Sequence, residues 1–412
     1  MYVKIHRGSA QIGGNLVEVG TAKTRLMFDA GANLPPLDGT APTKEPEIEG
    51  LTAGVPAFDG VFLSHHHGDH CGLACRILPK IPLFAGRETG HILDVIADFT
   101  STAHPPISDY ITAGVPLTVG DLTVTPVAVD HSATDAYLFV VQGEGQTLIY
   151  TGDYREGGGL AADIVQKFGK IDAVISEGTN IAPGRNPGAG PRTEAEVAVC
   201  AEALMKGHSG TVFVLCSSTN AGRVEAIYRA AEGAGRACWE DVFMSSITKK
   251  GSEGNTFVAF WIGADTVTNP YFSKLNEERR MVGAAVLGKL PGKKVVFIRP
   301  TMLPFLRRYL ESAGLGDHAL LYSVWGGYRA TEPYKSLLSF CENMGITVEN
   351  LHVSGHACRT QLVDFLSGLN AETIIPIHCM PEDRPQFSAL FPACRFVADG
   401  ERLEVGGERI EG

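Results

Sequence analysis

The sequence VFLSHHHGDH at residues 61–70 joins an apolar run, typical of a buried strand, to a cluster of metal-binding side chains. Because the cluster lies on a loop at the end of a strand, neighbouring side chains can point toward two different cations. The alternating pair His65 and His67 can share one ion. Asp69 and His70 can bind a second ion about 3.5–4 Å away. A surface polyhistidine patch explains the stretch less well, because it follows a buried strand and contains an aspartate.

Two metal ions need further ligands, including a carboxylate that can bridge them. Asp153 is the best candidate, since it lies in YTGDY at residues 150–154, directly after an apolar strand pattern. His131 also follows a strand pattern. Taken alone, Asp153 fits a turn and His131 fits a hydrogen-bonded histidine equally well, but their order after the cluster favours metal binding. His66 is expected to take no part.

The chain has 412 residues, enough for two or three domains. Strand patterns dominate the first third, and a stretch rich in Gly and Pro at residues 181–192 predicts a domain boundary. Beyond it, strand patterns alternate with helix patterns over residues 211–231, 294–312 and 319–343, which predicts a parallel α/β module. Polar motifs at strand ends return after residue 350.

The composition sets limits on the class of protein. The net charge of −11, from 35 basic and 46 acidic residues, argues against a general polyanion-coating surface but allows a locally basic groove. No apolar run approaches the roughly 18 residues of a membrane span, and residues 1–14 lack a signal-peptide pattern, so we expect a cytoplasmic protein without membrane contact. Nine scattered cysteines predict free thiols.

Asp29 follows the strand pattern of residues 25–28 and precedes these motifs. The order of the motifs resembles that of the metallo-β-lactamase superfamily. This resemblance implies an α/β fold in which two sheets lie between helical layers, an αββα sandwich. It also implies two zinc ions, with manganese as an alternative. The implied ligands are His65, His67 and His131 for one ion, Asp69 and His70 for the other, and Asp153 as the bridge. Asp29 would support the site from behind, although a turn position explains it equally well.

Three later motifs narrow the resemblance. SEGTN at residues 176–180, SGHA at 354–357 and PIHC at 376–379 match, in order, motifs A, B and C of the β-CASP nucleases. In that family a parallel α/β module is inserted into the metallo-β-lactamase domain, and the likeness is greatest to the ribonuclease J branch. The implied domains are a metallo-β-lactamase domain over residues 1–196 and 351–412 and a β-CASP domain over residues 197–350.

The resemblance also assigns roles in motifs A to C. His378 completes the ligands of the second zinc ion, and a histidine at motif C is typical of RNA-directed members. His356 is the candidate general acid or phosphate contact. Glu177 is expected to orient a ligand histidine through its carboxylate. Ser218, before a helix pattern, and Ser354 would line a pocket for a terminal phosphate, although Ser218 fits a helix cap nearly as well.

Together these expectations describe a metal-dependent ribonuclease that hydrolyses single-stranded RNA. The nucleophile would be a hydroxide that bridges two zinc ions and that Asp153 and Asp69 orient. Cleavage would be 5′→3′ exonucleolytic, endonucleolytic or both, and a homodimer is implied by family likeness alone. The C-terminal domain of typical ribonuclease J is expected to be absent.

Other functions stay open. A DNA-processing nuclease is the nearest alternative, because the net charge and the motifs do not decide between RNA and DNA as the substrate. A thioester or lactone hydrolase would have no use for the inserted module. A catalytically silent binding subunit would have lost metal ligands, whereas all seven expected positions are filled here.

Overall fold

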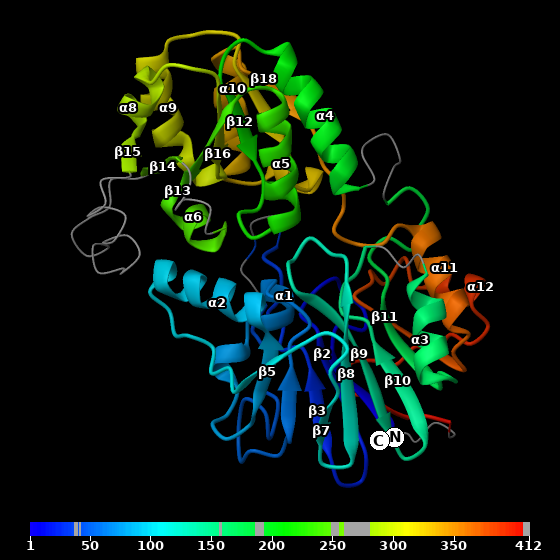
Figure 1. Cartoon of the computed structure of the whole chain (residues 1–412). Helices are drawn as coiled ribbons and strands as arrows, with labels where there is room; N and C mark the ends of the chain where they lie inside the picture. Colours follow the sequence, from blue (N-terminus) through cyan, green and yellow to red (C-terminus); the bar gives the residue numbers. More distant parts are fainter. Residues whose placement is uncertain are drawn as a thin grey trace.

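The computed structural model describes residues 1–36, 40, 43–155, 159–185, 193–248, 255–258 and 281–406. Residues 186–192 of the stretch expected to mark a domain boundary lie outside this set. Figure 1 shows a lower body with two sheets, built from the blue to cyan part and the orange to red part of the chain. The green to yellow middle of the chain forms an upper body around a third sheet.

The first sheet of the lower body has seven strands within the described residues. Their order is β20 (Arg402–Glu404), β1 (Tyr2–Arg7), β2 (Leu16–Gly20), β3 (Arg25–Phe28), β4 (Gly60–Phe62), β5 (Leu83–Gly86) and β6 (Asp109–Ile111). Strands β3 to β6 run parallel, with Phe28 in register with Phe62. The carboxyl ends of β3 and β4 therefore lie side by side, which brings Asp29 next to the loop that carries the histidine cluster.

The second sheet has six strands in the described part of the chain. Their order is β19 (Thr373–Ile377), β11 (Ala173–Glu177), β10 (Gln146–Tyr150), β9 (Ala136–Gly143), β8 (Leu122–Val129) and β7 (Leu117–Val119). Strands β10, β11 and β19 run parallel. Because parallel strands end at the same edge of a sheet, the segments that follow β10, β11 and β19 meet there.

An apolar core joins the two sheets. The ring of Phe28 on β3 lies 5.4 Å from that of Phe139 on β9 and 5.6 Å from that of Tyr150 on β10. Helices α1 (Gly68–Cys71) and α2 (Arg87–Thr100) lie against the outer face of the first sheet. Helices α3 (Leu160–Phe168), α11 (Arg359–Leu369) and α12 (Pro385–Leu390) cover the outer face of the second. The expected αββα sandwich is confirmed (Figure 1).

The third sheet is parallel throughout its seven described strands, as the alternating pattern predicts. Their order is β15 (Met281–Gly283), β14 (Asn255–Val258), β13 (Ala237–Asp241), β16 (Lys294–Ile298), β12 (Val212–Leu215), β17 (Ala319–Tyr322) and β18 (Thr347–Asn350). Helices α8 (Ala284–Lys289), α9 (Leu303–Ala313) and α10 (Tyr334–Asn343) pack on one face. Helices α4 (Glu194–Gly207), α5 (Ala221–Gly233) and α6 (Val242–Thr248) lie on the other. Because helices cover both faces, β12 is apolar along its whole length and β16 is apolar after Lys294.

Some local expectations differ from the structure. The pattern of residues 71–78 predicts a short helix, but the structure has a single helical turn that begins earlier, at Gly68, followed by the 3-10 turn η1 (Ala74–Arg76). Helix α4 begins at Glu194 and β18 ends at Asn350, near the boundaries expected at 196 and 350, which stay predictions. None of the described helices has the length and apolar character needed to cross a membrane.

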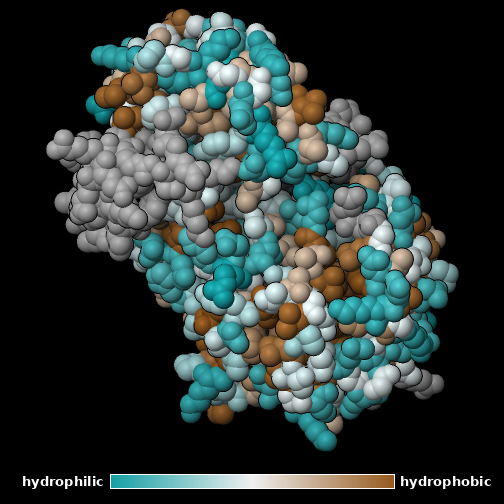
Figure 2. All heavy atoms as spheres, in the orientation of Figure 1, coloured by the Kyte–Doolittle hydropathy of each residue, from teal (hydrophilic) through white to brown (hydrophobic). Residues whose placement is uncertain are grey.

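The two bodies meet through an apolar contact and a buried ion network. Ile92 and Val95 on α2 pack against Ile247 on α6. In Figure 2, hydrophilic residues gather on the surface near this junction. Beneath the surface, the carboxylate of Glu194 accepts hydrogen bonds from Arg155 Nη1 at 2.9 Å and from Arg223 Nε at 2.7 Å.

The Glu194 carboxylate thus links two arginines that belong to different bodies. Arg155 follows β10 and also binds both carboxylate oxygens of Asp130 at 2.8 Å, while Arg223 on α5 is 1 % exposed. Burial opposes ionisation of Glu194, but the hydrogen bonds and charge of Arg223 and then of Arg155 outweigh it and lower the pKa of Glu194. Ionised Glu194 therefore stabilises the junction.

We expect Glu194→Gln to lower the free energy of unfolding at pH 7 by about 2–4 kcal/mol, because it leaves two buried arginines without their shared carboxylate. Since the folded pKa of Glu194 is lowered, its contribution is complete above the ordinary glutamate pKa and is lost as the pH falls through the lowered value. Urea unfolding of both proteins between pH 7 and pH 3 measures this difference.

Glu202→Gln is the matched control, because Glu202 lies on the same helix and pairs with Lys206 at the surface. We expect a change below about 0.5 kcal/mol for it. Equal effects of the two substitutions at pH 7 would contradict a special role for Glu194.

Candidate metal centre

Hydrogen bonds to Asp29 hold the loop that follows β4 in place. Asp29 Oδ1 accepts a hydrogen bond from Ser64 N at 2.7 Å, and Asp29 Oδ2 accepts one from Ser64 Oγ at 2.8 Å. The same Oδ2 lies 2.6 Å from His70 Nδ1 and accepts a hydrogen bond from Tyr150 OH at 2.6 Å. With its Nδ1 held by a carboxylate, His70 turns its Nε2 away from Asp29 and toward the cluster. Tyr150 had no signal in the sequence that would assign it here.

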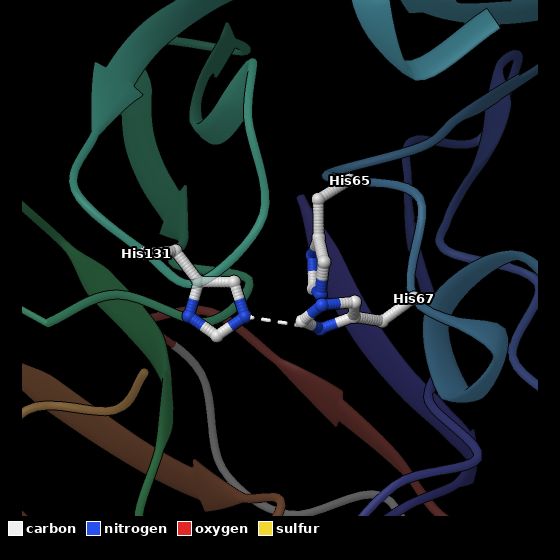
Figure 3. Close-up of side chains that lie close together, drawn as sticks. All are labelled: His65, His67 and His131. Atoms are coloured by element: carbon white, nitrogen blue, oxygen red, sulfur yellow. Dashed lines mark hydrogen bonds between the residues drawn. The ribbon is translucent and has the colours of Figure 1, made fainter. Parts of the chain in front are cut away.

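Three histidines converge from two loops (Figure 3). His65 and His67 come from the loop after β4, and His131 comes from the loop after β8. One nitrogen of each ring lies within 4.8 Å of the others, and His131 Nε2 lies 3.2 Å from His67 Nδ1. The other nitrogen of His131, Nδ1, donates to the carbonyl of Gly355 at 2.6 Å, which leaves Nε2 with a lone pair directed at its neighbours.

A second group contains Asp69, His70 and His378, whose ligand atoms also lie within 4.8 Å of one another. His378 Nε2 lies 3.3 Å from Asp69 Oδ2. His378 directly follows β19 and has a φ of +48°, a left-handed conformation that is uncommon for a residue other than glycine. Its Nδ1 lies 2.8 Å from Thr179 Oγ1, which fixes the ring from the opposite side.

Asp153 lies between the two groups. Its Oδ2 is 3.0 Å from His70 Nε2 and 3.8 Å from His378 Nε2. The same oxygen is 4.0 Å from His65 Nε2 and 3.9 Å from His131 Nε2. One carboxylate therefore faces both groups of histidines, as a bridging ligand must.

The donor set fits divalent cations. His65 Nε2, His70 Nε2 and Asp153 Oδ1 are buried and make no hydrogen bond. Burying a polar atom without a partner costs free energy, so three such atoms in one place indicate that ions normally satisfy them. Imidazole nitrogen and carboxylate oxygen are the ligands of zinc and, with more oxygen, of manganese.

The electrostatics keep the first group of histidines neutral. Burial, followed by the neighbouring histidines, lowers the pKa of His65 and of His131 well below the usual value. Burial also lowers the pKa of His67 to about 4. For Asp153, burial opposes ionisation, but the charges of His378 and then His70 outweigh it and lower the pKa. Neutral imidazole and ionised carboxylate are the forms that bind metal.

His356 lies beside the two groups and is 23 % exposed at its side chain. Its Nδ1 is 3.3 Å from Glu177 Oε2, 3.2 Å from Thr179 Oγ1 and 3.7 Å from Asp153 Oδ2. Burial disfavours the charged ring, but the carboxylates of Glu177 and then Asp153 outweigh it and raise the pKa of His356 to about 9. Glu177, expected to orient a ligand histidine, contacts His356, and its carboxylate also lies within 4.8 Å of a ring nitrogen of His378.

The structure places the two serines expected at a phosphate pocket differently. Ser354 Oγ accepts hydrogen bonds from His356 N at 3.1 Å and from Asn180 Nδ2 at 3.3 Å, so it lies at the edge of the metal site. Ser218 is buried in the turn after β12. The cap of α5 is Asn220, whose side chain accepts a hydrogen bond from Arg223 N at 3.0 Å. Ser218 is therefore not the cap.

Two residues of motif A join this site without having been assigned a role from the sequence. Thr179 contacts both His356 and His378, and Asn180 connects to Ser354. Their position beside Glu177 in the motif was the available signal.

We expect His65→Ala to lower the zinc content by about one ion per chain or more, because it removes a nitrogen from the buried cluster. Elemental analysis after zinc loading and dialysis measures the content. His66→Gln is the control, since His66 belongs to none of the described ligand groups, and it should retain the full content. An unchanged zinc content in His65→Ala would contradict the assignment.

We expect Asp29→Asn to weaken zinc affinity by about 10- to 100-fold while the protein stays folded, because an amide cannot accept hydrogen bonds at both of its ends. Competition with a chromogenic chelator measures the affinity. Asp59→Asn is the control, since Asp59 precedes β4 and accepts a hydrogen bond from Arg25 N at the surface. Wild-type affinity in Asp29→Asn would show that Asp29 does not position the ligands.

Comparison with known proteins adds two family matches. Residues 24–205 match the beta-lactamase superfamily domain, and residues 343–391 match the Zn-dependent metallo-hydrolase RNA specificity domain. The second match contains Ser354, His356 and His378.

The chain is also similar to several ribonuclease J proteins. It is 25 % identical to ribonuclease J of Sinorhizobium meliloti over 90 % of this chain and 67 % of that protein. Identity to ribonuclease J of Mycobacterium tuberculosis is 22 %, over 90 % of this chain and 67 % of the relative. Identity to ribonuclease J of Helicobacter pylori strain J99 is 21 %, over 97 % of this chain and 60 % of that protein. The chain thus spans about two thirds or less of the length of these relatives.

A crystal structure of a protein of unknown function from Enterococcus faecalis V583 superposes with a TM-score of 0.77. The two chains are 19 % identical, and the match covers 98 % of this chain and 99 % of that one. At this identity the likeness shows a shared fold.

Proposed function

We propose that the chain is a metallo-β-lactamase superfamily hydrolase and that it hydrolyses phosphodiester bonds of RNA, because it matches both the beta-lactamase superfamily domain and the Zn-dependent metallo-hydrolase RNA specificity domain. One observation carries this proposal. Side chains from four separate loops converge on one buried cluster with unsatisfied ligand atoms, and the two motifs inside the RNA specificity match contribute His378 to it and His356 beside it.

We propose two zinc ions at this site, with manganese as a substitute. His65, His67 and His131 would hold one ion, Asp69, His70 and His378 the other, and Asp153 would contact both. Such a pair, when bound, supplies Lewis-acid stabilisation of phosphoryl oxygens and activation of water. The remaining tasks belong to the chain: Asp69 and Asp153 orient the attacking water, and the cluster excludes bulk solvent from it.

His356 is the proposed proton donor. Its Nδ1 faces Glu177 and Thr179, so its Nε2 is left for the substrate. A proton delivered from Nε2 to the 3′ oxygen would complete the departure of the leaving group. Glu177 supports this role by holding the ring in place and stabilising its charged form.

Ser354 and Ser218 are proposed to receive a terminal phosphate of the RNA. Ser354 lies beside His356, and Ser218 lies just before α5, whose first backbone N–H groups can bind an anion. A pocket of this kind favours 5′→3′ removal of nucleotides, and internal cleavage is the second mode that we propose. The division into residues 1–196, 197–350 and 351–412, a homodimer and a cytoplasmic location stay predictions.

The decisive experiment compares three single-stranded substrates of matched sequence with the zinc-loaded protein. These are RNA with a 5′-monophosphate, RNA with a 5′-hydroxyl, and DNA with a 5′-monophosphate. We expect mononucleotides from the phosphorylated RNA, and a loss of at least about 100-fold in Asp153→Ala, because it removes the carboxylate shared by both groups.

His66→Gln should retain activity. Full metal-dependent activity in Asp153→Ala would contradict the proposed centre. Cleavage of DNA alone would identify a DNA-processing nuclease. Hydrolysis of thioesters or lactones without any nuclease activity would identify a small-molecule hydrolase, and no hydrolysis at all would indicate a binding subunit.

A further inference from the structure

A tryptophan stands at the surface just beyond the end of β17. Trp325 is 52 % exposed, whereas Trp239 in the same body is 9 % exposed. A large aromatic ring left half in water gives up the free energy that its burial would contribute. Trp325 lies directly before the 3-10 turn η5 (Gly326–Ala330), and a ligand that covered its ring would recover this free energy.

The ring is held rather than loose. Its centroid lies 5.3 Å from that of Tyr328 at an interplanar angle of 89°, and Tyr328 stacks on Tyr334 at 5.2 Å and 13°. The backbone is fixed as well, since Trp325 O accepts hydrogen bonds from Tyr322 OH and Tyr328 N, both at 3.2 Å. A ring that is already immobilised loses little entropy when a flat ligand stacks on it.

Gly327 provides the room for the ring. A Cβ atom at this position would lie 2.2 Å from the Trp325 ring, closer than any real contact. The absence of a side chain at Gly327 thus sets where the tryptophan lies.

The aromatic cluster lies at the carboxyl edge of the third sheet, from which the chain runs on to Ser354 of the site. It follows the carboxyl end of β17, and at that end Ser323 Oγ accepts a hydrogen bond from Arg223 of the junction at 2.6 Å. Arg223 Nη2 also donates to Val353 O at 3.2 Å, next to Ser354 of the site. Burial raises the pKa of Tyr328, and the charge of Asp69, one of the proposed metal ligands, raises it further. Tyr322 at the end of β17 also pairs with Asn350 at the end of β18, four residues before Ser354.

A positively charged side chain, Arg329, lies beside these aromatic rings. The guanidinium of Arg329 lies 4.3 Å above the ring of Tyr322 and donates a hydrogen bond to Asn350 Oδ1. Within the part of the chain that the structure describes, Arg329 forms no ion pair with a carboxylate. Its charge is available to a phosphate group of a strand whose bases lie on the neighbouring rings.

We propose that Trp325, supported by Tyr328, is a stacking platform for one nucleobase of the single-stranded RNA that enters the metal centre. This inference rests on the proposed ribonuclease function and adds the contact that holds the strand. Every base presents a flat π-face, so the platform binds without strong sequence preference. A base stacked here anchors the strand on the upper body while the scissile phosphate lies at the lower one.

The test combines Trp325→Ala with RNA substrates in which one nucleotide at a time is abasic. In the wild type, removing the stacked base should lower kcat/KM by about 5- to 100-fold through KM, with kcat little changed. Trp325→Ala should show the same loss on intact RNA and no further loss at that abasic position, because the two changes delete the same contact. Trp325→Phe should restore most of the affinity.

Two further variants separate stacking from a general structural effect. Gly327→Ala keeps the tryptophan but displaces its ring, and it should weaken RNA binding as Trp325→Ala does. Leu315→Ala removes a 74 % exposed side chain at the opposite end of β17 and should leave kcat/KM unchanged. Both variants, and Trp325→Ala, should keep the full zinc content.

The outcomes distinguish this inference from the function on which it rests. If the wild type hydrolyses RNA and Trp325→Ala does so with unchanged KM, the platform is wrong and the ribonuclease function stands. The same holds if every abasic position costs both proteins equally. If the wild type neither binds nor hydrolyses RNA, the function fails and the platform fails with it.

Discussion

The carboxylate of Asp153 is the interaction on which the arrangement of the chain depends. It is buried within 4.0 Å of four histidine rings that come from three separate loops. A buried charge surrounded by polar rings is tolerated only if all of them are held in a fixed geometry and compensated. That geometry comes from the strand ends. The parallel strands β10, β11 and β19 end at one edge of the second sheet, and β3 and β4 end side by side in the first.

The second body adds to this site the surface at which we propose that RNA binds. Its α5 reaches the first body through the paired arginines on Glu194, and the same Arg223 holds the end of β17. The metal centre, the segment with His356 and the aromatic cluster around Trp325 are therefore linked by one buried network. A small substrate would need only the first of these, whereas the RNA strand that we propose as substrate would use all of them.

The same packing keeps the histidines of the first group neutral and the carboxylate of Asp153 ionised. Burial alone would disfavour every charge in the cluster, and the histidines of the first group follow that rule. His356 does not, because Glu177 and Asp153 lie next to it. His70 does not either: burial opposes its charge, but the carboxylates of Asp153 and then Asp29 outweigh it and raise its pKa. The fold thus gives buried residues of one type opposite pKa shifts, according to whether a carboxylate lies beside the ring.

The sequence by itself predicted the parallel module and the candidate metal ligands, because strand periodicity and the HHHGDH cluster are local patterns. It also placed those residues at strand ends. The sandwich was implied by the resemblance of the sequence motifs to the metallo-β-lactamase superfamily. Only the tertiary structure decided that Glu177 contacts His356, that Asn220 rather than Ser218 caps α5, and that Tyr150 and Thr179 adjoin the site. These depend on strand register and on the packing of one body against the other. Both are set by contacts between residues far apart in the chain, which no local pattern records.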